Sequence, residues 1–440
     1  MKARELALAV VRDVFPAPGS NAIARTAQAS FDYRARRSHL DERDRAFAVE
    51  LAYGAIKMRR ALDWQLEAFV THKNIPQVVR EILRLAAYEL LYTRADAHAT
   101  VFEFVNLAKR FSHRRLANLV NAVLRSLLRA NPEEPQRASF SSDDEYLATR
   151  YSLPTWLVRQ WREVFESQLE AVCAGVNAPA RAAIVVNTLK DGVGEAADKL
   201  RAAGVETTQS PYVAESLLVE TGSRARAGAA RDWWPQSESS AMAVDVLAPQ
   251  PGETILDVCT GRGNKALQIG TRLRGDGSLC CVELDVRKVT TLQGRLEEAG
   301  IAAAVVTGDA TGDVLGNDRW FDRVLVDAPC SGIGVVGRHP EARWKKEGSD
   351  GERLALTQRA LLERAARHVY PGGVLVYAVC TTDPRETTEV IEWFLSGQNF
   401  DRGLIPAAYR PLLTAAGDVL VPPGIEGRDG FYIARLERRA

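Results

Sequence analysis

Apolar residues recur at three- and four-residue spacing through the first 130 residues of the chain. Four segments show this pattern most clearly, with charged and polar residues at the positions between. Such spacing places the apolar side chains on one face of an α-helix. The pattern therefore predicts an N-terminal helical bundle, with helices within residues 42–56, 60–70, 78–92 and 116–130.

The last 200 or so residues follow another pattern, in which short continuous apolar runs alternate with helix-like segments. Continuous runs of this kind are typical of parallel strands that are buried on both faces. They predict an open α/β sheet, with strands around residues 254–257, 279–283, 302–309, 324–326 and 374–377.

The middle of the chain predicts a smaller unit. Residues 181–220 alternate as strand, helix, strand and strand, which indicates an α+β module. A polar stretch from Asn131 and Pro132 to Glu145 predicts a linker before it. In the helix expected over residues 153–165, we expect Trp156 and Trp161 to pack in the core rather than stack on bases.

Glycines and acids follow the first strands of the C-terminal sheet. Gly261 and Gly263 lie in the loop after residues 254–257, Glu283 ends the next strand, and Asp309 ends the third. Glycines let a ligand approach the N-terminus of the following helix, and an acid on the next strand can accept hydrogen bonds from both ribose hydroxyls. This arrangement predicts a nucleoside-binding half-sheet.

The loop itself favours one nucleoside cofactor. Ala266 could formally complete a dinucleotide fingerprint, which needs a third glycine or alanine after the second glycine. Asp257, however, begins the loop, as in a methyltransferase that holds the amino-acid end of its methyl donor. We therefore expect S-adenosylmethionine.

Two cysteines end predicted strands of the same sheet. Cys330 follows the strand at 324–326 within Asp-Ala-Pro-Cys, and Cys380 follows the strand at 374–377. A thiolate is a strong nucleophile near neutral pH, so two thiols at strand ends indicate covalent chemistry on an electrophilic ring carbon. The alternative is that both are small buried hydrophobic residues, as we expect for Cys280 and Cys281 inside a strand.

Several longer motifs make the chain similar to a known family. They are DAPCSG (327–332), RHP (338–340) with Trp344, PGG-VLVYA-C (371–380) and DGFYIARL (429–436). Together they resemble the RNA cytosine-5 methyltransferases of the Sun/Fmu type, the bacterial small-subunit rRNA methyltransferase B group. The similarity runs over nearly the whole chain.

This resemblance implies a multidomain architecture. It predicts an all-α, NusB-like RNA-binding bundle over residues 1–135. Linker helices and a small α+β, RRM-like module follow over 136–235, and an α/β Rossmann-like class I methyltransferase domain over 236–440.

The resemblance also implies a role for each site residue. Cys380 would attack carbon 6 of cytosine, Cys330 would assist release of the methylated base, and Asp327 would contact and protonate the ring at N3. The implied cofactor contacts are Cys259, Thr260, Gly261, Arg262, Gly263, Asn264 and Lys265 around the methionine end, Glu283 at the ribose, Asp309 at the adenine, and Asp327.

Two departures from the family pattern stand out. The glycine loop is CTGRGNKA where the family has a sequence close to CAAPGGKT. The segment after the second strand is VCTTDPRETTE, with Val379 before the nucleophile and Arg385 where an acid is usual. We interpret these changes as an altered substrate fit.

Positive charge is concentrated in the N-terminal third, although the formal net charge of the chain is only +1. Residues 104–131 contain no Asp or Glu, and such a basic segment attracts phosphate. A solvated helix face is the alternative. The candidate RNA contacts are Lys109, Arg110, Arg114 and Arg115, with Arg338 of the RHP motif.

Composition agrees with a large cytoplasmic protein. No apolar run reaches the roughly 18 residues of a membrane span, and the charged opening segment lacks the features of a signal peptide. Six cysteines without metal-ligand spacing indicate reduced thiols and no metal. We expect a monomer that methylates carbon 5 of cytosine in small-subunit rRNA. The alternatives are a tRNA cytosine-5 methyltransferase and a noncatalytic RNA-binding or assembly factor with a relic pocket.

Overall fold

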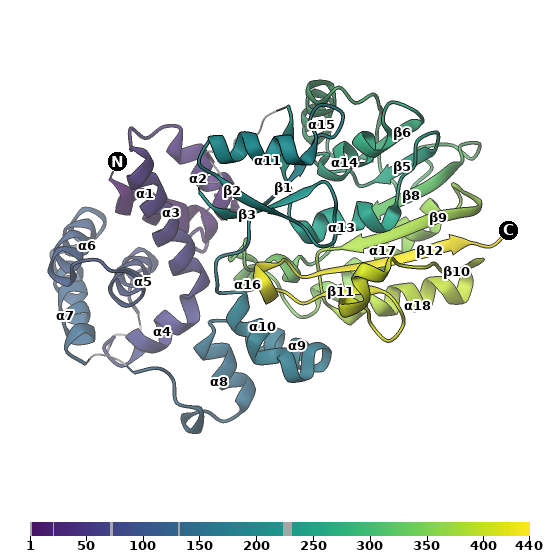
Figure 1. Cartoon of the computed structure of the whole chain (residues 1–440). Helices are drawn as coiled ribbons and strands as arrows, with labels where there is room; N and C mark the ends of the chain where they lie inside the picture. The colour runs from purple at the N-terminus through teal and green to yellow at the C-terminus, as the bar shows by residue number, and fades with distance from the viewer. Residues whose placement is uncertain (1, 21, 71–73, 131–132, 223–230) are drawn as a thin grey trace. The chain divides into compact units, whose positions relative to one another are not determined.

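The computed structural model describes residues 2–20, 22–70, 74–130, 133–222 and 231–440. The chain divides into two compact units (Figure 1). One comprises Met1–Glu163 and His339–Lys346, and the other comprises Val164–Arg338 and Glu347–Ala440. The finer division into segments 1–135, 136–235 and 236–440 stays a prediction.

The first unit is helical, as the apolar spacing predicts. Its helices pack their apolar faces into one core, in which Leu51, Leu83, Phe104 and Leu124 are fully buried. The helices are α1 (Ala3–Val14), α2 (Ala27–Ala35), α3 (Glu42–Lys57), α4 (Arg59–Glu67), α5 (Gln77–Tyr92), α6 (Ala97–Phe111), α7 (Arg114–Ala130), η1 (Arg137–Ser139), α8 (Asp143–Arg150) and α9 (Thr155–Phe165). Trp161 on α9 is fully buried, which confirms that it packs.

Short polar side chains fix where several of these helices begin. Thr26, Asp41, Asp96 and Ser142 each accept a hydrogen bond from a backbone N–H in the first turn of α2, α3, α6 and α8. Such caps satisfy N–H groups that have no partner within the helix.

The predicted linker is only partly irregular. Asn131 and Pro132 lie outside the described residues, whereas residues 143–145 at its end form the first turn of α8, so that part of the prediction is wrong. The polarity of this segment reflects its capping serine and the acids of the first turn, which favour a helix N-terminus.

A short segment from late in the sequence belongs to the helical unit. Here α16 (Ala342–Lys345) places Trp344 against the core of the bundle, and its indole Nε1 donates to the Ile56 carbonyl at 2.6 Å. Arg343 is fully buried and donates to the Ser152 carbonyl at 3.1 Å. The sequence pattern alone gives no sign of this placement.

The second unit contains a small antiparallel sheet that includes the predicted α+β module. Its four strands pair in the order β2-β3-β1-β4, and α11 packs on them. The elements are η2 (Glu166–Gln168), α10 (Leu169–Gly175), β1 (Ala183–Val186), α11 (Val193–Ala202), β2 (Glu206–Gln209), β3 (Ser216–Thr221) and β4 (Trp233–Pro235). The sequence pattern does not predict the fourth strand.

The larger sheet of this unit has eight strands. Strands β7-β6-β5-β8-β9 are parallel, and the antiparallel strands β12, β10 and β11 complete it. The strands are β5 (Thr254–Val258), β6 (Ser278–Glu283), β7 (Ala304–Thr307), β8 (Phe321–Asp327), β9 (Val369–Val379), β10 (Phe400–Arg402), β11 (Val419–Val421) and β12 (Phe431–Arg438).

Helices cover both faces of this sheet (Figure 1). Alternate residues of each strand point to opposite faces, so Leu325 packs with α13, α14 and α15, whereas Val324 packs with α17 and α18. The helices are α13 (Glu238–Leu247), α14 (Asn264–Leu273), α15 (Val286–Ala299), α17 (Asp350–Ala366) and α18 (Thr388–Gly397), with η3 (Ile333–Val335), η4 (Pro384–Glu386), η5 (Ala407–Leu412) and η6 (Ile425–Gly427) in loops.

The strand order sets the position of the chemistry. The chain runs outward through β5, β6 and β7 and then returns to the other side of β5 to form β8 and β9. Ligands of open α/β sheets bind beyond the carboxyl ends of the strands at such a reversal. In the described residues, no helix is long and apolar enough to cross a membrane.

One glycine is required for close packing in the helical unit. A Cβ added to Gly54 on α3 would lie 1.9 Å from the ring carbon Cζ of Tyr88 on α5. We predict that Gly54→Ala lowers the free energy of unfolding in urea by about 1–3 kcal/mol, because overpacking forces side chains and backbone apart.

The matched control is Gly294→Ala on α15, where an added Cβ meets no atom within 4 Å. Removing backbone freedom from the unfolded chain should leave this variant as stable as the original or up to about 1 kcal/mol more stable. Equal stability of the two variants would contradict the packing argument.

Candidate active site

Two loops meet at the reversal of strand order. One follows β5 and contains Cys259–Lys265, and the other follows β8 and contains Cys330. Parallel pairing of β5 with β8 aligns Asp257 with Leu325, and pairing of β8 with β9 aligns Asp327 with Ala378. The strand ends predicted to carry chemistry therefore lie at one edge of the sheet.

The two candidate thiols are in contact. The Sγ atoms of Cys330 and Cys380 lie 3.3 Å apart, although the residues are 50 positions apart in the sequence. The adjacent Cys380 thiol, together with burial, raises the pKa of Cys330 well above its usual range. Cys330 is therefore protonated near neutral pH.

A buried carboxylate connects the two cysteine loops. Glu386 accepts hydrogen bonds from the backbone N–H of Ser331 at 2.8 Å and from the Thr381 hydroxyl at 3.1 Å, and it also binds the Ser331 hydroxyl. Gln358 on α17 donates to the same carboxylate at 3.0 Å. Glu386 thereby fixes the residue after each thiol relative to the other.

Contacts between glycines hold the Cys380 loop from a second direction. The N–H of Gly334 donates to the Cys380 carbonyl at 3.1 Å, and the N–H of Gly430 donates to the Gly334 carbonyl at 2.8 Å. A Cβ on Gly334 would lie 2.2 Å from the Gly430 oxygen, so the backbones can approach only without side chains. The motifs that contain Cys330, Cys380 and Gly430 thus form one assembly.

Sequence reasoning missed Glu386 and Gly334 as site residues. The available signal was the acid that remains after Pro384, next to the unusual Arg385, and the glycine that follows DAPCSG by two positions. Neither residue carries reactive chemistry itself. Their contribution is positional.

Lys265 and Asp327 form an ion pair at the same edge of the sheet. Lys265 Nζ lies 2.7 Å from Asp327 Oδ2, and it also lies 5.3 Å from the centroid of the Phe431 ring. The resemblance assigns Lys265 to the methionine end of the cofactor, and in the structure it pairs with Asp327. The ion pair joins the β5 loop to the β8 loop.

The β5 loop has an unusual backbone. Cys259, Gly261 and Gly263 all have positive φ, and Gly263 is the N-cap of α14. Burial, followed by nearby negative charge, raises the pKa of the Cys259 thiol to about 12, so this cysteine stays neutral. The loop presents backbone rather than a reactive side chain.

Asp257 lies fully buried beneath this loop. Burial, with the negative charge of Asp327 second, raises the pKa of its carboxyl group to about 8. Neither carboxyl oxygen has a hydrogen-bond partner among the described residues. Because an unpaired buried polar group is costly, the arrangement favours a ligand that brings positive charge nearby.

Glu283 and Asp309 differ in how they are held. Glu283 accepts from the backbone N–H of Gly261 at 2.8 Å and of Asp285 at 2.9 Å, and its Oε1 pairs with Lys288 at 3.5 Å, which leaves further acceptor capacity on Oε2. Asp309 is exposed, and hydrogen bonds from Thr311 lower its pKa. Both lie at the same edge of the sheet as the glycine loop.

The structure accounts for the two unusual residues near Cys380. Val379 is fully buried in β9, where it pairs with Tyr432 on β12. Arg385 binds both carboxylate oxygens of Asp383, at 2.9 and 2.6 Å. Neither residue disrupts the contacts between the thiols.

The candidate RNA contacts fall into two groups. Lys109, Arg114 and Arg115 are exposed on the helical unit without a carboxylate partner among the described residues. Arg110 is also exposed but pairs with Glu5. Arg338 pairs with Asp429 at 2.8 Å and donates to the Arg181 carbonyl at 2.5 Å, so its charge is already engaged.

Comparison with known sequences decides the family. The sequence model of 16S rRNA methyltransferase RsmB/F matches residues 244–437, the NusB family model matches 1–129, and an RsmF/B-like, ferredoxin-like domain model matches 153–225. A probable ribosomal RNA small subunit methyltransferase B from Bacillus subtilis is 31% identical, over 91% of this chain and 92% of the relative. The chain belongs to the small-subunit rRNA methyltransferase B family.

Other relatives and structures agree. A ribosomal RNA small subunit methyltransferase B from Vibrio cholerae is 31% identical, over 92% of each chain. The crystal structure of PH0851 matches the fold with a TM-score of 0.79 and 24% identity, over 99% of this chain and 98% of that one. The structure of NSun6 from Pyrococcus horikoshii with SFG matches with a TM-score of 0.58 and 17% identity, over 65% and 98%. The predicted NusB-like bundle and Rossmann-like methyltransferase fold are confirmed.

Membership of this family of methyltransferases makes S-adenosylmethionine the cofactor, as the loop predicts. The residues fit it: a Cβ on Gly261 would meet only the Cys259 carbonyl oxygen within 4 Å, Glu283 has acceptor capacity for a ribose hydroxyl, and Asp257 is a buried acid beneath the loop. The expected absence of a metal stays a prediction.

We predict that Glu283→Ala weakens S-adenosylmethionine binding by roughly 1.5–3 kcal/mol for each charged hydrogen bond removed. The substitution removes the proposed ribose acceptor and releases the loop N–H of Gly261. Isothermal titration calorimetry on the full chain measures the change.

Glu297→Ala is the matched control, because it removes an exposed carboxylate from the neighbouring helix α15. It should bind the cofactor like the original protein. Unchanged affinity in Glu283→Ala would place the ribose contact elsewhere.

Proposed function

We propose that this protein methylates carbon 5 of a cytosine in small-subunit rRNA through a covalent bond between Cys380 and the base. The observation that carries the proposal is the contact between two thiols, 3.3 Å apart at adjacent strand ends. The Asp327–Lys265 ion pair lies at the same edge of the sheet. The relatives' names, which specify ribosomal RNA of the small subunit, support the choice of RNA.

This reaction requires a nucleophile that activates the cytosine ring, and a cysteine thiolate can do so. Carbon 5 of cytosine is a poor nucleophile until a thiolate adds to carbon 6 and increases its electron density. The new carbon–sulfur bond divides one difficult step into easier ones. S-adenosylmethionine, when bound, supplies the methyl group as an electrophile from its sulfonium.

The family resemblance supports Cys380 as the nucleophile, because it places the attacking cysteine in the segment after β9. Attack requires a thiolate, and the contact with Cys330 at 3.3 Å puts a second thiol beside it. Cys330 then acts at the end of the cycle. A general base accepts the proton from carbon 5, the carbon 5–carbon 6 double bond re-forms, and Cys380 leaves carbon 6 as a thiolate; we assign to Cys330 assistance in this elimination.

Asp327 lies three positions before Cys330 in the sequence, and its carboxylate is 2.7 Å from Lys265 Nζ. We assign it to the cytosine ring at N3, where its carboxylate takes up a proton, gives it to N3 during addition and takes it back on elimination, which limits negative charge on the ring. The same ion pair connects Asp327 to the loop assigned to the methionine end of the cofactor, which includes Cys259, Thr260, Arg262 and Asn264. The Lys265–Asp327 ion pair therefore connects the loop assigned to the methyl donor with the residue assigned to the cytosine.

The two thiols make a discriminating prediction. Cys380→Ala should abolish both methyl transfer and any covalent RNA adduct. Cys330→Ala should form the bond at Cys380 but release it slowly, so that a denaturing gel shows a protein band shifted by RNA. Removal of both thiols should eliminate this band.

Cys280→Ala, which removes a buried thiol from β6, is the control and should keep turnover without accumulating adduct. Turnover in Cys380→Ala, with loss of activity but no adduct in Cys330→Ala, would reverse the assignment. Methylation of tRNA but not rRNA would change the assigned RNA substrate and leave the assignment of the thiols unchanged. Normal cofactor binding with no methylation of any cytosine-containing RNA would favour the noncatalytic alternative.

The exposed basic residues of the helical unit make a separate prediction. Replacing Lys109, Arg114 and Arg115 together by Gln should weaken RNA binding. It should also reduce the slope of log affinity against log salt by somewhat under one for each phosphate that is no longer bound. Affinity for S-adenosylmethionine should not change.

Replacement of exposed Arg36, Arg43 and Arg45 on the same unit is the charge-matched control. The two variants could instead show equal slopes of log affinity against log salt. That result would mean that Lys109, Arg114 and Arg115 are ordinary solvated surface residues.

A further inference from the structure

A groove of about 740 Å³ runs between α6 and α7 of the helical unit. Its volume lies within the range of about 300–1,000 Å³ that is usual for ligand pockets. Val101, Phe102 and Val105 on α6 and Leu128 on α7 supply apolar surface. The groove lies outside the candidate active site, and the sequence pattern does not predict it.

The most unusual side chain of the groove is Phe102. It is 64% exposed, which is high for a large apolar residue on a folded helix. Within the described residues it makes no stacking or cation–π contact with another side chain. One face of an aromatic ring is therefore available beside the groove.

Three cations surround the groove, and their hydrogen bonds are to neutral groups. Lys109 donates to the Asn106 side chain at 3.3 Å, Arg125 to the Asn121 side chain at 3.1 Å, and Arg129 to Ser126 at 2.9 Å. In the part of the chain that the structure describes, none of the three pairs with a carboxylate. Their positive charge is not compensated locally.

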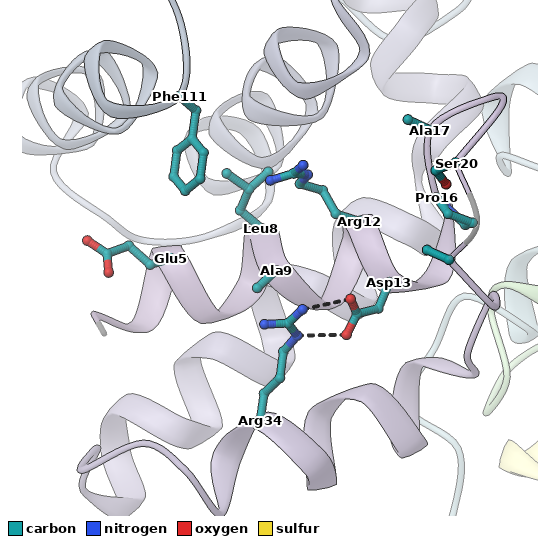
Figure 2. A pocket seen from close by; sticks show the side chains of 11 residues that line it. Glu5, Leu8, Ala9, Arg12, Asp13, Pro16, Ala17, Ser20, Arg34 and Phe111 are labelled. Atoms are coloured by element: carbon teal, nitrogen blue, oxygen red, sulfur yellow. Dashed lines mark hydrogen bonds and ion pairs between the residues drawn. The ribbon is translucent and has the colours of Figure 1, made fainter.

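A second pocket of the same unit shows that this charge pattern is not general. This pocket has a volume of about 430 Å³. Its lining includes Phe111, from α6, with Arg12 5.8 Å from the ring centroid, and the carboxylates of Glu5 and Asp13 (Figure 2). Asp13 forms two hydrogen bonds with Arg34, each 2.7 Å long. Glu5 and Asp13 balance the positive charges of Arg12 and Arg34 in this pocket, so its exposed aromatic ring lies beside no uncompensated positive charge.

We propose that the α6–α7 groove binds a single-stranded segment of the RNA substrate, with an unpaired base stacked on Phe102 and phosphates bound by Lys109, Arg125 and Arg129. This inference deepens the proposed function and rests on it. It assigns to the helical unit a local contact with a base in addition to attraction of the RNA backbone.

The chemistry of the groove favours RNA over a protein helix. Sequence-tolerant binding of single strands combines an aromatic platform with a positively charged groove, and unpaired bases of folded RNA stack on such platforms. An apolar protein helix would fill the floor but leave three cations without partners. A polyanion with flat aromatic bases satisfies both parts.

The test measures binding of a short, fluorescent, single-stranded RNA of mixed sequence to the full chain, without cofactor. Phe102→Ala should weaken binding by roughly 5- to 150-fold, the range for removal of one base–aromatic stack. Phe102→Leu, which keeps an apolar side chain, should weaken it similarly. Phe102→Trp should retain binding, because it keeps a stacking surface.

Phe111→Ala is the matched control. It removes the same side chain from the same helix, at a 42% exposed position in the pocket that contains Glu5 and Asp13. It should bind RNA like the original protein. Equal weakening by Phe102→Ala and Phe111→Ala, or full binding by Phe102→Leu, would overturn the proposal.

The cations are tested by salt dependence. Arg125→Gln with Arg129→Gln should reduce the log-log slope by about 0.7 for each phosphate that is no longer bound. Arg43→Gln with Arg45→Gln on α3 removes the same charge outside the groove and should reduce the slope less. Equal slopes for these two double variants would overturn the phosphate contacts.

The outcomes separate this proposal from the proposed function. If the original protein binds and methylates RNA but Phe102→Ala binds equally well, only the groove assignment fails. If Phe102→Ala loses binding while the original protein shows no methyl transfer, the groove assignment holds and the cytosine-5 activity fails.

Discussion

Parallel pairing of β8 with β9 is the constraint on which the site depends. The register aligns Asp327 with Ala378, so the residues that follow each strand emerge at the same edge. This alignment brings Cys330 and Cys380 to a sulfur–sulfur distance of 3.3 Å. Glu386 then fixes the loops through Ser331 and Thr381, and burial raises the pKa of its carboxyl group. Pairing places the thiols, and the buried hydrogen bonds keep them there.

The cofactor loop and the thiols form one site because Lys265 and Asp327 connect them. Lys265 lies in the first turn of α14, after the glycine loop, and Asp327 ends β8. An ion pair that is largely shielded from water is strong only if its geometry is maintained. Strand β5, which leads into the glycine loop, and strand β8 are both central in the sheet and buried on both faces. This burial restricts movement of Lys265 and Asp327.

Much of this structure could be predicted from sequence because its local patterns are strong. The strand ends at Cys330 and Cys380, the glycine loop and the acid at Glu283 follow directly from apolar runs and the residues after them. The roles of Glu386 and Gly334 could not be predicted, because they depend on contacts between distant loops. Placement of Trp344 in the helical unit also depends on tertiary packing, and the first turn of α8 was hidden by its polar composition. The local pattern of apolar and polar residues predicts individual helices and strands, whereas contacts between distant segments decide which of them pack together.

The central claim is that Cys380 bonds to carbon 6 of cytosine during methyl transfer. RNA that contains 5-fluorocytosine tests it directly, because fluorine at carbon 5 cannot leave as a proton does and the methylated adduct persists. After digestion of protein and RNA, mass spectrometry locates the modified residue. The account predicts a methylated fluorocytosine on Cys380 that requires S-adenosylmethionine. An adduct on Cys330, or methylation of ordinary cytosine without any adduct in the fluorinated RNA, would contradict it.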